Sequence, residues 1–263
     1  MSGRIARLLF PPKCAACGEL LDWYTSDGAC ALCPSCRRLW DSEKLETCTR
    51  CAKHVTECTC VPEALEKAGC AGFYKLVYYR HGKRDPVQNR AIYRIKQTRD
   101  QKTVNFLAEE CFGALRAILA AVRADGGDPS SVFLTYVPRG RRARLEYGTD
   151  QAQALAKALS ARSGIPCLRL LKKRAGKRRE QKQLNRAERL RNTQNAYATV
   201  GSLALKNMYL ILVDDIVTTG ITAAACVRLL RRAGALNVWC LDVASDDVNQ
   251  STKLYLNIQI KSS

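Results

Sequence analysis

The sequence lacks any long run of apolar residues. No stretch approaches the roughly 18 apolar residues of a membrane-spanning helix, so we expect no membrane span. Residues 1–10 carry basic side chains and the short apolar cluster Leu8, Leu9 and Phe10. They lack the long apolar region and small-residue cleavage site of an export signal. These absences predict a cytoplasmic protein.

Acidic and aromatic residues are also scarce. The chain has 24 Asp and Glu against 43 Lys and Arg, which gives a formal net charge of +19. Such a charge favours polyanionic partners, and single-stranded DNA is a candidate. Aromatic residues make up only 7% of the chain, which argues against a surface on which exposed bases stack. Contact with nucleic acid is therefore expected to be weak and electrostatic.

Cysteine, by contrast, is abundant and unevenly distributed. Ten of the 14 cysteines lie within residues 14–70. A chain of 263 residues can form one core of about 150–200 residues and a small additional module. We therefore expect a cysteine-rich module over residues 1–70 and a larger domain over residues 71–263. The other four cysteines are expected to be small buried residues of that domain: Cys111, Cys167, Cys226 and Cys240.

Closely spaced cysteine pairs predict metal sites in this module. Without an export signal, such pairs are more typical of metal binding than of disulfides. A Cys-x-x-Cys knuckle presents two thiolates to one tetrahedral ion, and two knuckles complete a structural zinc site. The first predicted site consists of Cys14, Cys17, Cys33 and Cys36. The second consists of Cys48, Cys51, Cys58 and Cys60. About two structural zinc ions per chain are expected.

Other ligands are compatible with the same spacing. Cys30 lies three residues before Cys33, so these two could form the knuckle in place of Cys33 and Cys36. His54 could replace one thiolate of the second site, although its polar loop favours an exposed ring, and Cys70 is a further spare thiol. The module has few bulky apolar residues, so bound metal is expected to supply the stability that a core would otherwise give.

Residues 71–263 alternate between short apolar strands and amphipathic helices. The expected strands are residues 71–79, 132–137, 167–171, 208–213 and 237–243. The expected helices are residues 86–97, 103–123, 149–162 and 221–233. Strands that alternate with helices predict an α/β fold, in which helices flank a parallel sheet.

The stretch from Leu210 to Thr222 carries the clearest functional pattern. Asp214 and Asp215 directly follow an apolar strand, at the carboxyl end where α/β sheets bind ligands. A loop of threonine and glycine then leads into a helix N-terminus, whose free N–H groups and dipole attract phosphate. The pattern therefore indicates a site for a sugar phosphate.

This stretch resembles the phosphoribosyl pyrophosphate (PRPP) signature of type I phosphoribosyltransferases. There, two acids and two apolar residues precede Thr-Thr-Gly-x-Thr. The resemblance implies that Asp214 and Asp215 bind the ribose hydroxyls as catalytic residues, that the last five residues bind the 5-phosphate, and that Mg²⁺ accompanies PRPP. The implied PRPP-binding segment is Asp214, Asp215, Ile216, Val217, Thr218, Thr219, Gly220, Ile221 and Thr222.

Two basic segments could bind the pyrophosphate. In the same family the loop after an earlier strand has this role, and the matching residues here are Arg139, Gly140 and Arg141. Arginines that merely face solvent are an equally common outcome. Residues 169–191 contain eleven Lys or Arg and two Glu. Their place between core strands favours a lid over the site, with nucleic acid as a second use and a solvated basic helix as the alternative.

The chain as a whole resembles the ComF/ComFC family. The resemblance depends on the cysteine-rich amino terminus, the Val-Pro loop, the segment Gly148–Ala152, the segment Gln181–Asn192 and the PRPP signature. It implies a zinc-binding module ahead of a phosphoribosyltransferase-like domain, a role in natural competence, and partners in the DNA-uptake machinery. Where the family usually has Arg-Gly-Phe-Asn-Gln, this chain has Tyr147-Gly-Thr-Asp-Gln151, so the contact of that arginine is lost.

Three functions are compatible with this pattern. The first is a PRPP-dependent transferase whose acceptor the sequence does not identify. The second is a PRPP-sensing protein that keeps the site without turnover. The third is a competence factor that binds single-stranded DNA through its basic residues.

Overall fold

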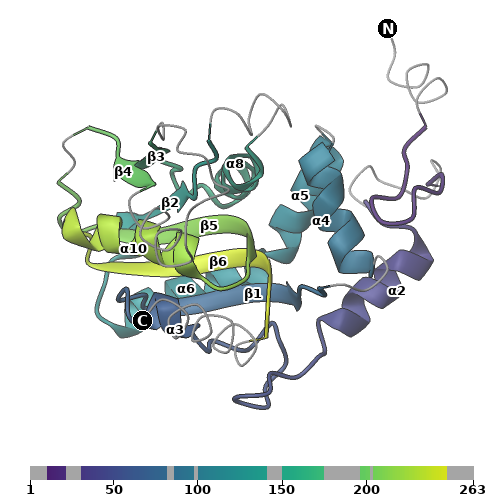
Figure 1. Cartoon of the computed structure of the whole chain (residues 1–263), viewed down its shortest axis with the longest axis horizontal. Coiled ribbons are helices and arrows are strands. Elements are labelled where there is room, and N and C mark those ends of the chain that lie inside the picture. Colours follow the sequence, from purple (N-terminus) through teal and green to yellow (C-terminus); the bar gives the residue numbers. More distant parts are fainter. Residues whose placement is uncertain are drawn as a thin grey trace, which may run out of the picture.

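The computed structural model describes residues 11–21, 31–81, 86–97, 100–140, 150–174, 196–201 and 204–247. Its centre is a parallel sheet of four strands in the order β1, β6, β5, β2 (Figure 1). These strands are β1 (Gly72–Tyr78), β2 (Val132–Tyr136), β5 (Tyr209–Val217) and β6 (Asn237–Ser245). The expected α/β architecture is confirmed: helices flank a parallel sheet.

Apolar residues on both faces of the sheet explain why helices cover both. Along β5, Ile211 and Val213 pack in one buried cluster, whereas Leu210 and Leu212 pack in another, because successive side chains of a strand point to opposite faces. The first cluster includes residues of α5 (Gln101–Glu110), α6 (Phe112–Ala124) and α8 (Gln151–Ser163). The second includes residues of α3 (Glu63–Glu66) and α10 (Ile221–Arg232).

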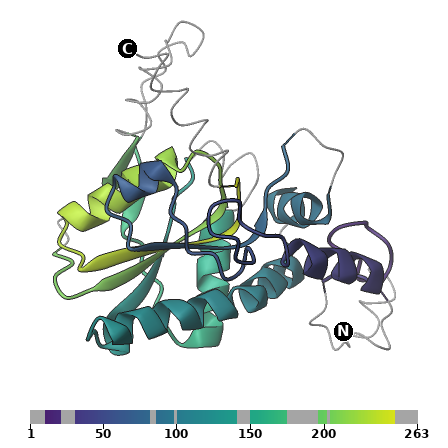
Figure 2. The same ribbon diagram turned by 90° about the horizontal axis from the view of Figure 1, so that it is seen from below.

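Two helices pack residues of the amino-terminal region against the first of these clusters. They are α2 (Pro34–Glu43) and α4 (Val87–Gln97). Trp40 of α2 has no exposed surface and lies edge-on to Phe106 of α5, with ring centroids 5.4 Å apart. Its indole Nε1 donates to Glu110, at 2.9 Å, and Lys44 Nζ also contacts this carboxylate, at 2.6 Å. The α2 helix lies on the side of the molecule away from α10 (Figures 1 and 2).

The prediction of a single helix over residues 103–123 is wrong. The structure has two helices, α5 and α6, which meet at Cys111. Backbone bonds still run from Cys111 N to Leu107 O and from Leu115 N to Cys111 O, so the hydrogen-bonded ladder is only locally disturbed. Gly113 in the first turn of α6 is a weak helix former, and no proline marks the break.

The strand expected over residues 167–171 is displaced. Cys167 makes a single parallel bridge to Leu134, and the strand itself is β3 (Leu171–Lys173), which pairs antiparallel with β4 (Tyr197–Thr199). The short β4 and the 3-10 turn η1 (Pro129–Ser131) have no long apolar pattern and were not expected. Most of the basic segment 169–191 lies outside the described residues.

The strand expected over residues 208–213 extends further, because β5 continues to Val217. Its partner β6 is equally long and pairs with it to the end, with Asp214 opposite Asp242 and Val217 opposite Ser245. Asp214 and Asp215 therefore lie within β5, near its carboxyl end, and do not come after the strand as expected. Among the described helices, none combines the length and apolar character that a bilayer crossing demands.

Candidate functional site

The acid pair lies at the carboxyl edge of the sheet, with one acid on each face. Asp214 shares the face of Leu210 and Leu212, which pack toward α10, and Asp215 points to the opposite face. There the Asp215 carboxylate accepts a hydrogen bond from Arg139 Nη2, at 2.9 Å. The acids and the loop after β2 are 76 residues apart in sequence, and the structure brings them into contact.

A third carboxylate lies beside this pair. Asp242 of β6 is paired in register with Asp214 and is only 1% exposed. Burial raises the pKa of Asp214 well above its usual value, and the charges of Asp215 and Asp242 raise it further. Burial likewise raises the pKa of Asp242. Neither carboxylate oxygen of Asp242 has a hydrogen-bond partner among the described residues.

The loop after β5 forms the N-terminal end of α10. Gly220 has a φ of 73° and is the N-cap of this helix, a left-handed conformation that favours glycine. A Cβ built on Gly220 would lie 3.5 Å from Leu65 and 3.6 Å from Pro62, so residues of the amino-terminal region border the loop. Thr218, Thr219, Ile221 and Thr222 are all partly exposed. The free N–H groups of the first helical turn can bind an anion here.

A basic cavity of about 130 Å³ is lined by Arg139, the residue that contacts Asp215. Arg139 and Gly140 border it from the loop after β2, and the basic residues of β3 border it from the other side. The Arg139 backbone N–H donates to Asp150 Oδ2, at 2.9 Å, which holds the loop against the start of α8. The basic residues of its lining are Arg139, Arg169, Lys172, Lys173 and Arg174. Such a cavity suits an anionic group; the predicted Arg141 lies outside the described residues.

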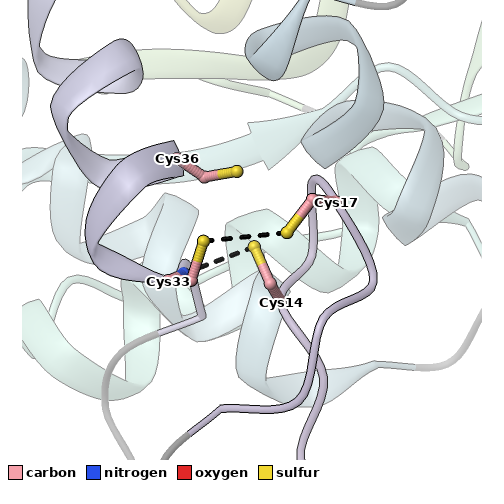
Figure 3. Close-up of side chains that lie close together, drawn as sticks. All are labelled: Cys14, Cys17, Cys33 and Cys36. Atoms are coloured by element: carbon pink, nitrogen blue, oxygen red, sulfur yellow. Dashed lines mark hydrogen bonds between the residues drawn. The ribbon is translucent and has the colours of Figure 1, made fainter.

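The first cysteine cluster brings together Cys14, Cys17, Cys33 and Cys36 (Figure 3). Their sulfur atoms all lie within 4.8 Å of one another, and the Cys17 and Cys33 sulfurs are 3.7 Å apart. Sulfurs around a tetrahedral zinc ion are about 3.8 Å apart, given Zn–S bonds of about 2.3 Å, whereas disulfide sulfurs are about 2 Å apart. The cluster could therefore hold one metal ion. The alternative ligand Cys30 lies outside the described residues.

The second cluster has the same spacing. It consists of Cys48, Cys51, Cys58 and Cys60, whose sulfurs also lie within 4.8 Å of one another. The alternatives point elsewhere: His54 Nδ1 lies 2.7 Å from Leu45 O, and Cys70 Sγ contacts Gly72 O and Cys240 Sγ. This cluster too could hold one metal ion.

Backbone N–H groups stabilise thiolates in both clusters. Although burial raises the pKa of Cys14, hydrogen bonds from the backbone of Cys17 and Cys33 lower it to about 7. Burial also raises the pKa of Cys48, but hydrogen bonds from the backbone N–H groups of Arg50 and Cys51 lower it to about 7. Burial and neighbouring thiols raise the pKa of other members, Cys17 to about 11 and Cys60 to about 12. A cation would favour the thiolate form of every member.

Sequence reasoning missed two polar features of the strands and the segments that follow them, the buried Lys75 and the contact between His81 and Asp246. Lys75 of β1 is 1% exposed, and its position inside a strand otherwise made of apolar and aromatic residues is the signal that could have revealed it. His81 Nε2 lies 2.6 Å from Oδ1 of the buried Asp246, and nothing in the sequence links these residues. Three of the four scattered cysteines are buried as expected, and Cys167 is partly exposed.

Part of the chain is similar in sequence to known proteins. The chain is similar to DNA utilization protein YhgH. It is 30% identical to the Salmonella typhi protein over 152 residues, which cover 57% of this chain and 64% of that protein. The Escherichia coli K12 protein is 44% identical over 55 residues, which cover 20% of this chain and 23% of that protein. The chain thus spans less than two thirds of these relatives.

No protein-family model matches the chain. Adenine phosphoribosyltransferase from Leishmania tarentolae aligns with a TM-score of 0.31 at 17% identity, over 59% of this chain and 77% of that one. The protein TT1426 from Thermus thermophilus aligns with a TM-score of 0.29 at 18% identity, over 60% of this chain and 80% of that one. These scores are too low to establish a common fold.

Proposed function

We propose that the chain binds PRPP at the carboxyl edge of its sheet and acts as a phosphoribosyltransferase-like protein in DNA uptake and transformation. One observation carries the proposal: Arg139 donates to Asp215 at 2.9 Å. This contact connects the basic cavity to the acid pair. The acid pair is followed in sequence by the N-terminus of α10. Ribose hydroxyls, a 5-phosphate and a pyrophosphate need these three kinds of group side by side.

Each part of PRPP has a proposed place in this site. Asp214 and Asp215 accept hydrogen bonds from the ribose hydroxyls, and residues 218–222 bind the 5-phosphate. Arg139, Gly140 and Arg141 bind the pyrophosphate together with the basic residues of β3. When bound with PRPP, Mg²⁺ neutralises part of the pyrophosphate charge. Positive side chains held close to the leaving group would stabilise the charge that develops as it departs.

The amino-terminal residues 1–70 form a proposed zinc module, with one ion in each cysteine cluster, ahead of the domain of residues 71–263. Four thiolates in tetrahedral spacing suit zinc, which has no redox chemistry of its own. Reduced thiols are maintained in the cytoplasm, which is the proposed location. The name of the relatives, DNA utilization protein, supports a role with DNA, and proteins of the uptake machinery are the proposed partners.

A non-catalytic role is the second candidate, because no described residue identifies an acceptor for the ribosyl group. In that case the site senses PRPP, or the net charge of +19 serves weak binding of single-stranded DNA. Calorimetry with PRPP and Mg²⁺ tests whether the chain binds PRPP, which both the transferase and the sensor require. Binding of PRPP is the expected result, and its absence would reject both PRPP roles. Release of pyrophosphate with an added acceptor would favour the transferase over the sensor.

The proposal predicts that PRPP binds more tightly as the pH rises. Burial raises the pKa of Asp214 above its usual value, and the ionised carboxylate is a stronger acceptor for a ribose hydroxyl than the protonated carboxyl. Affinity should therefore increase through the raised pKa and then level off. Asp242→Asn removes a neighbouring negative charge, so the pKa of Asp214 should fall and the rise in affinity should shift to lower pH.

Calorimetric titrations from about pH 5 to 8.5, a range that spans ordinary and raised carboxyl pKa values, would measure this shift. Wild type and variant bind the same ligand, so titration of the PRPP phosphates affects both profiles equally. Identical profiles for the two proteins would contradict the placement of Asp242 beside the ribose-binding acid.

A further inference from the structure

Lys75 is a charged side chain enclosed in the interior of the molecule. It lies in the middle of β1 and is 1% exposed. Its Nζ donates to Cys58 Sγ, at 3.2 Å, and lies 3.5 Å from Cys58 O. The rings of Phe73 and Tyr78 lie 5.3 and 5.9 Å from the ammonium group. A buried ammonium group is costly unless negative or π-rich groups surround it, and here the second cysteine cluster supplies such a group.

The same lysine begins a row of charged residues across the sheet. Lys75 is paired in register with Asp242, and Asp242 with Asp214. Neighbouring residues paired in this way point to the same face of a sheet. Asp242 is itself 1% exposed and has no hydrogen-bond partner among the described residues. Lys75 therefore provides a positive charge in a row that otherwise holds two carboxylates.

Two further contacts join the second cluster to the carboxyl edge. Thr49, which lies between Cys48 and Cys51, donates its hydroxyl to Asp247 Oδ1, at 2.6 Å, just beyond the end of β6. The chain leaves the cluster at Cys60 and brings Pro62 and Leu65 against the loop, 3.6 and 3.5 Å from a Cβ built on Gly220. Residues that flank the second cluster in sequence thus lie against the segment after β6 and against the Gly220 loop.

Among the described residues, the cysteines of the first cluster form hydrogen bonds with their own neighbourhood and none with β6 or the Gly220 loop. Its helix α2 packs on α5 through Trp40 and Glu110, on the side of the molecule away from α10 (Figures 1 and 2). Each cluster has four cysteine ligands whose sulfurs lie within 4.8 Å of one another, so loss of one ligand removes the same kind of site at two places in the molecule. This makes the first cluster a matched internal control.

We propose that Lys75 is a positioning residue that couples metal binding in the second cysteine cluster to PRPP binding at Asp214 and the Gly220 loop. This inference rests on the proposed function. Metal fixes the position of Cys58, and Cys58 fixes the Lys75 ammonium group. Lys75 then offsets the negative charge of Asp242, which lies beside the ribose-binding Asp214. PRPP and metal in the second cluster then stabilise each other, whereas metal in the first cluster has no effect on PRPP.

Single cysteine variants separate the two clusters. Cys60→Ser removes a partly exposed ligand and Cys17→Ser an exposed one, and we expect each variant to keep metal in the other cluster. We expect Cys60→Ser to weaken PRPP binding in calorimetry by roughly tenfold, a typical coupling between two sites. Cys17→Ser should change it less than twofold. Equal effects of the two variants would overturn the proposal.

The effect of PRPP on metal binding gives an independent test, made on folded protein that contains metal. Because coupling between binding free energies is reciprocal, PRPP should lower the fraction of metal that a chelator removes from the second cluster at equilibrium. We expect this in Cys17→Ser, which retains only the second cluster, and not in Cys60→Ser. If wild type binds PRPP but the ligand leaves metal release from the second cluster unchanged, the inference fails and the proposed function stands. If wild type binds no PRPP, both fail.

Lys75→Met tests the lysine itself and avoids damage to either cluster. Methionine keeps most of the volume but loses the charge and the N–H donor. Both metal ions should remain bound, while PRPP affinity falls roughly tenfold and the effect of PRPP on metal release disappears. In cobalt-loaded protein the thiolate-to-cobalt absorption band should shift, because a hydrogen bond to Cys58 sulfur tunes the ion. An unchanged band with unchanged PRPP affinity would contradict the role of Lys75.

Discussion

Replacement of both Asp214 and Asp215 by asparagine is expected to weaken PRPP binding by at least about a hundredfold. Hydrogen bonds to charged groups contribute about 1.5–3 kcal/mol each, so two of them correspond to about 3–6 kcal/mol, at about 1.4 kcal/mol per tenfold change in affinity. Asparagine keeps the size of each side chain but removes the charge. Calorimetry with PRPP and Mg²⁺ would measure the loss.

The two single variants are expected to differ. Asp215→Asn also weakens the contact with Arg139, which lies 2.9 Å from this carboxylate, and so disturbs the basic cavity. Asp214→Asn leaves that contact intact and should affect the ribose alone. Asp125→Asn is a matched control, because Asp125 is exposed and lies ahead of β2, at the opposite end of that strand. A double variant that binds PRPP like the control would reject the ribose site.

Loss of a ligand from the first cysteine cluster is the second large effect. We expect wild type to contain about two zinc ions per chain and Cys36→Ser to contain about one. Structural zinc contributes on the order of 10–16 kcal/mol of apparent binding energy in small domains, so this region should unfold locally without its ion. Trp40 is fully buried four residues after Cys36, and its fluorescence emission should shift to the red as it becomes exposed.

Metal analysis and fluorescence together check this result. Cys167→Ser is the control, since Cys167 belongs to neither cluster and should leave two zinc ions and the Trp40 emission unchanged. One ion or none in wild type would break the assignment of two four-thiolate sites. Emission that stays blue-shifted in Cys36→Ser would show that the packing of α2 does not depend on metal.

Much of the fold follows from apolar periodicity. The strands at Gly72–Tyr78 and Val132–Tyr136 and the helix at Ile221–Arg232 lie close to their expected bounds, because their patterns are long and regular. The extension of β5 could not be predicted in this way. Aspartate is disfavoured in strands, and only pairing with the equally long β6 keeps Asp214 and Asp215 in the pleat.

The candidate site was predictable where its residues are consecutive. The segment from Asp214 to Thr222 and the cysteine knuckles carry their chemistry in local spacing. The partner of Asp215 was only partly predictable, because parallel strands place Arg139 at the same edge but do not specify a contact. Lys75 and Asp242 escaped prediction entirely. Their importance depends on register between β1, β6 and β5, and a single sequence does not encode register in any local pattern.

The Lys75 contact with Cys58, at 3.2 Å, also has a consequence for how related chains can diverge. A buried ammonium group that loses the negatively charged group beside it is strongly destabilising. In relatives that have lost the second cysteine cluster, the position equivalent to Lys75 should therefore carry an uncharged residue. The two positions are expected to change together, although 17 residues separate them in the chain.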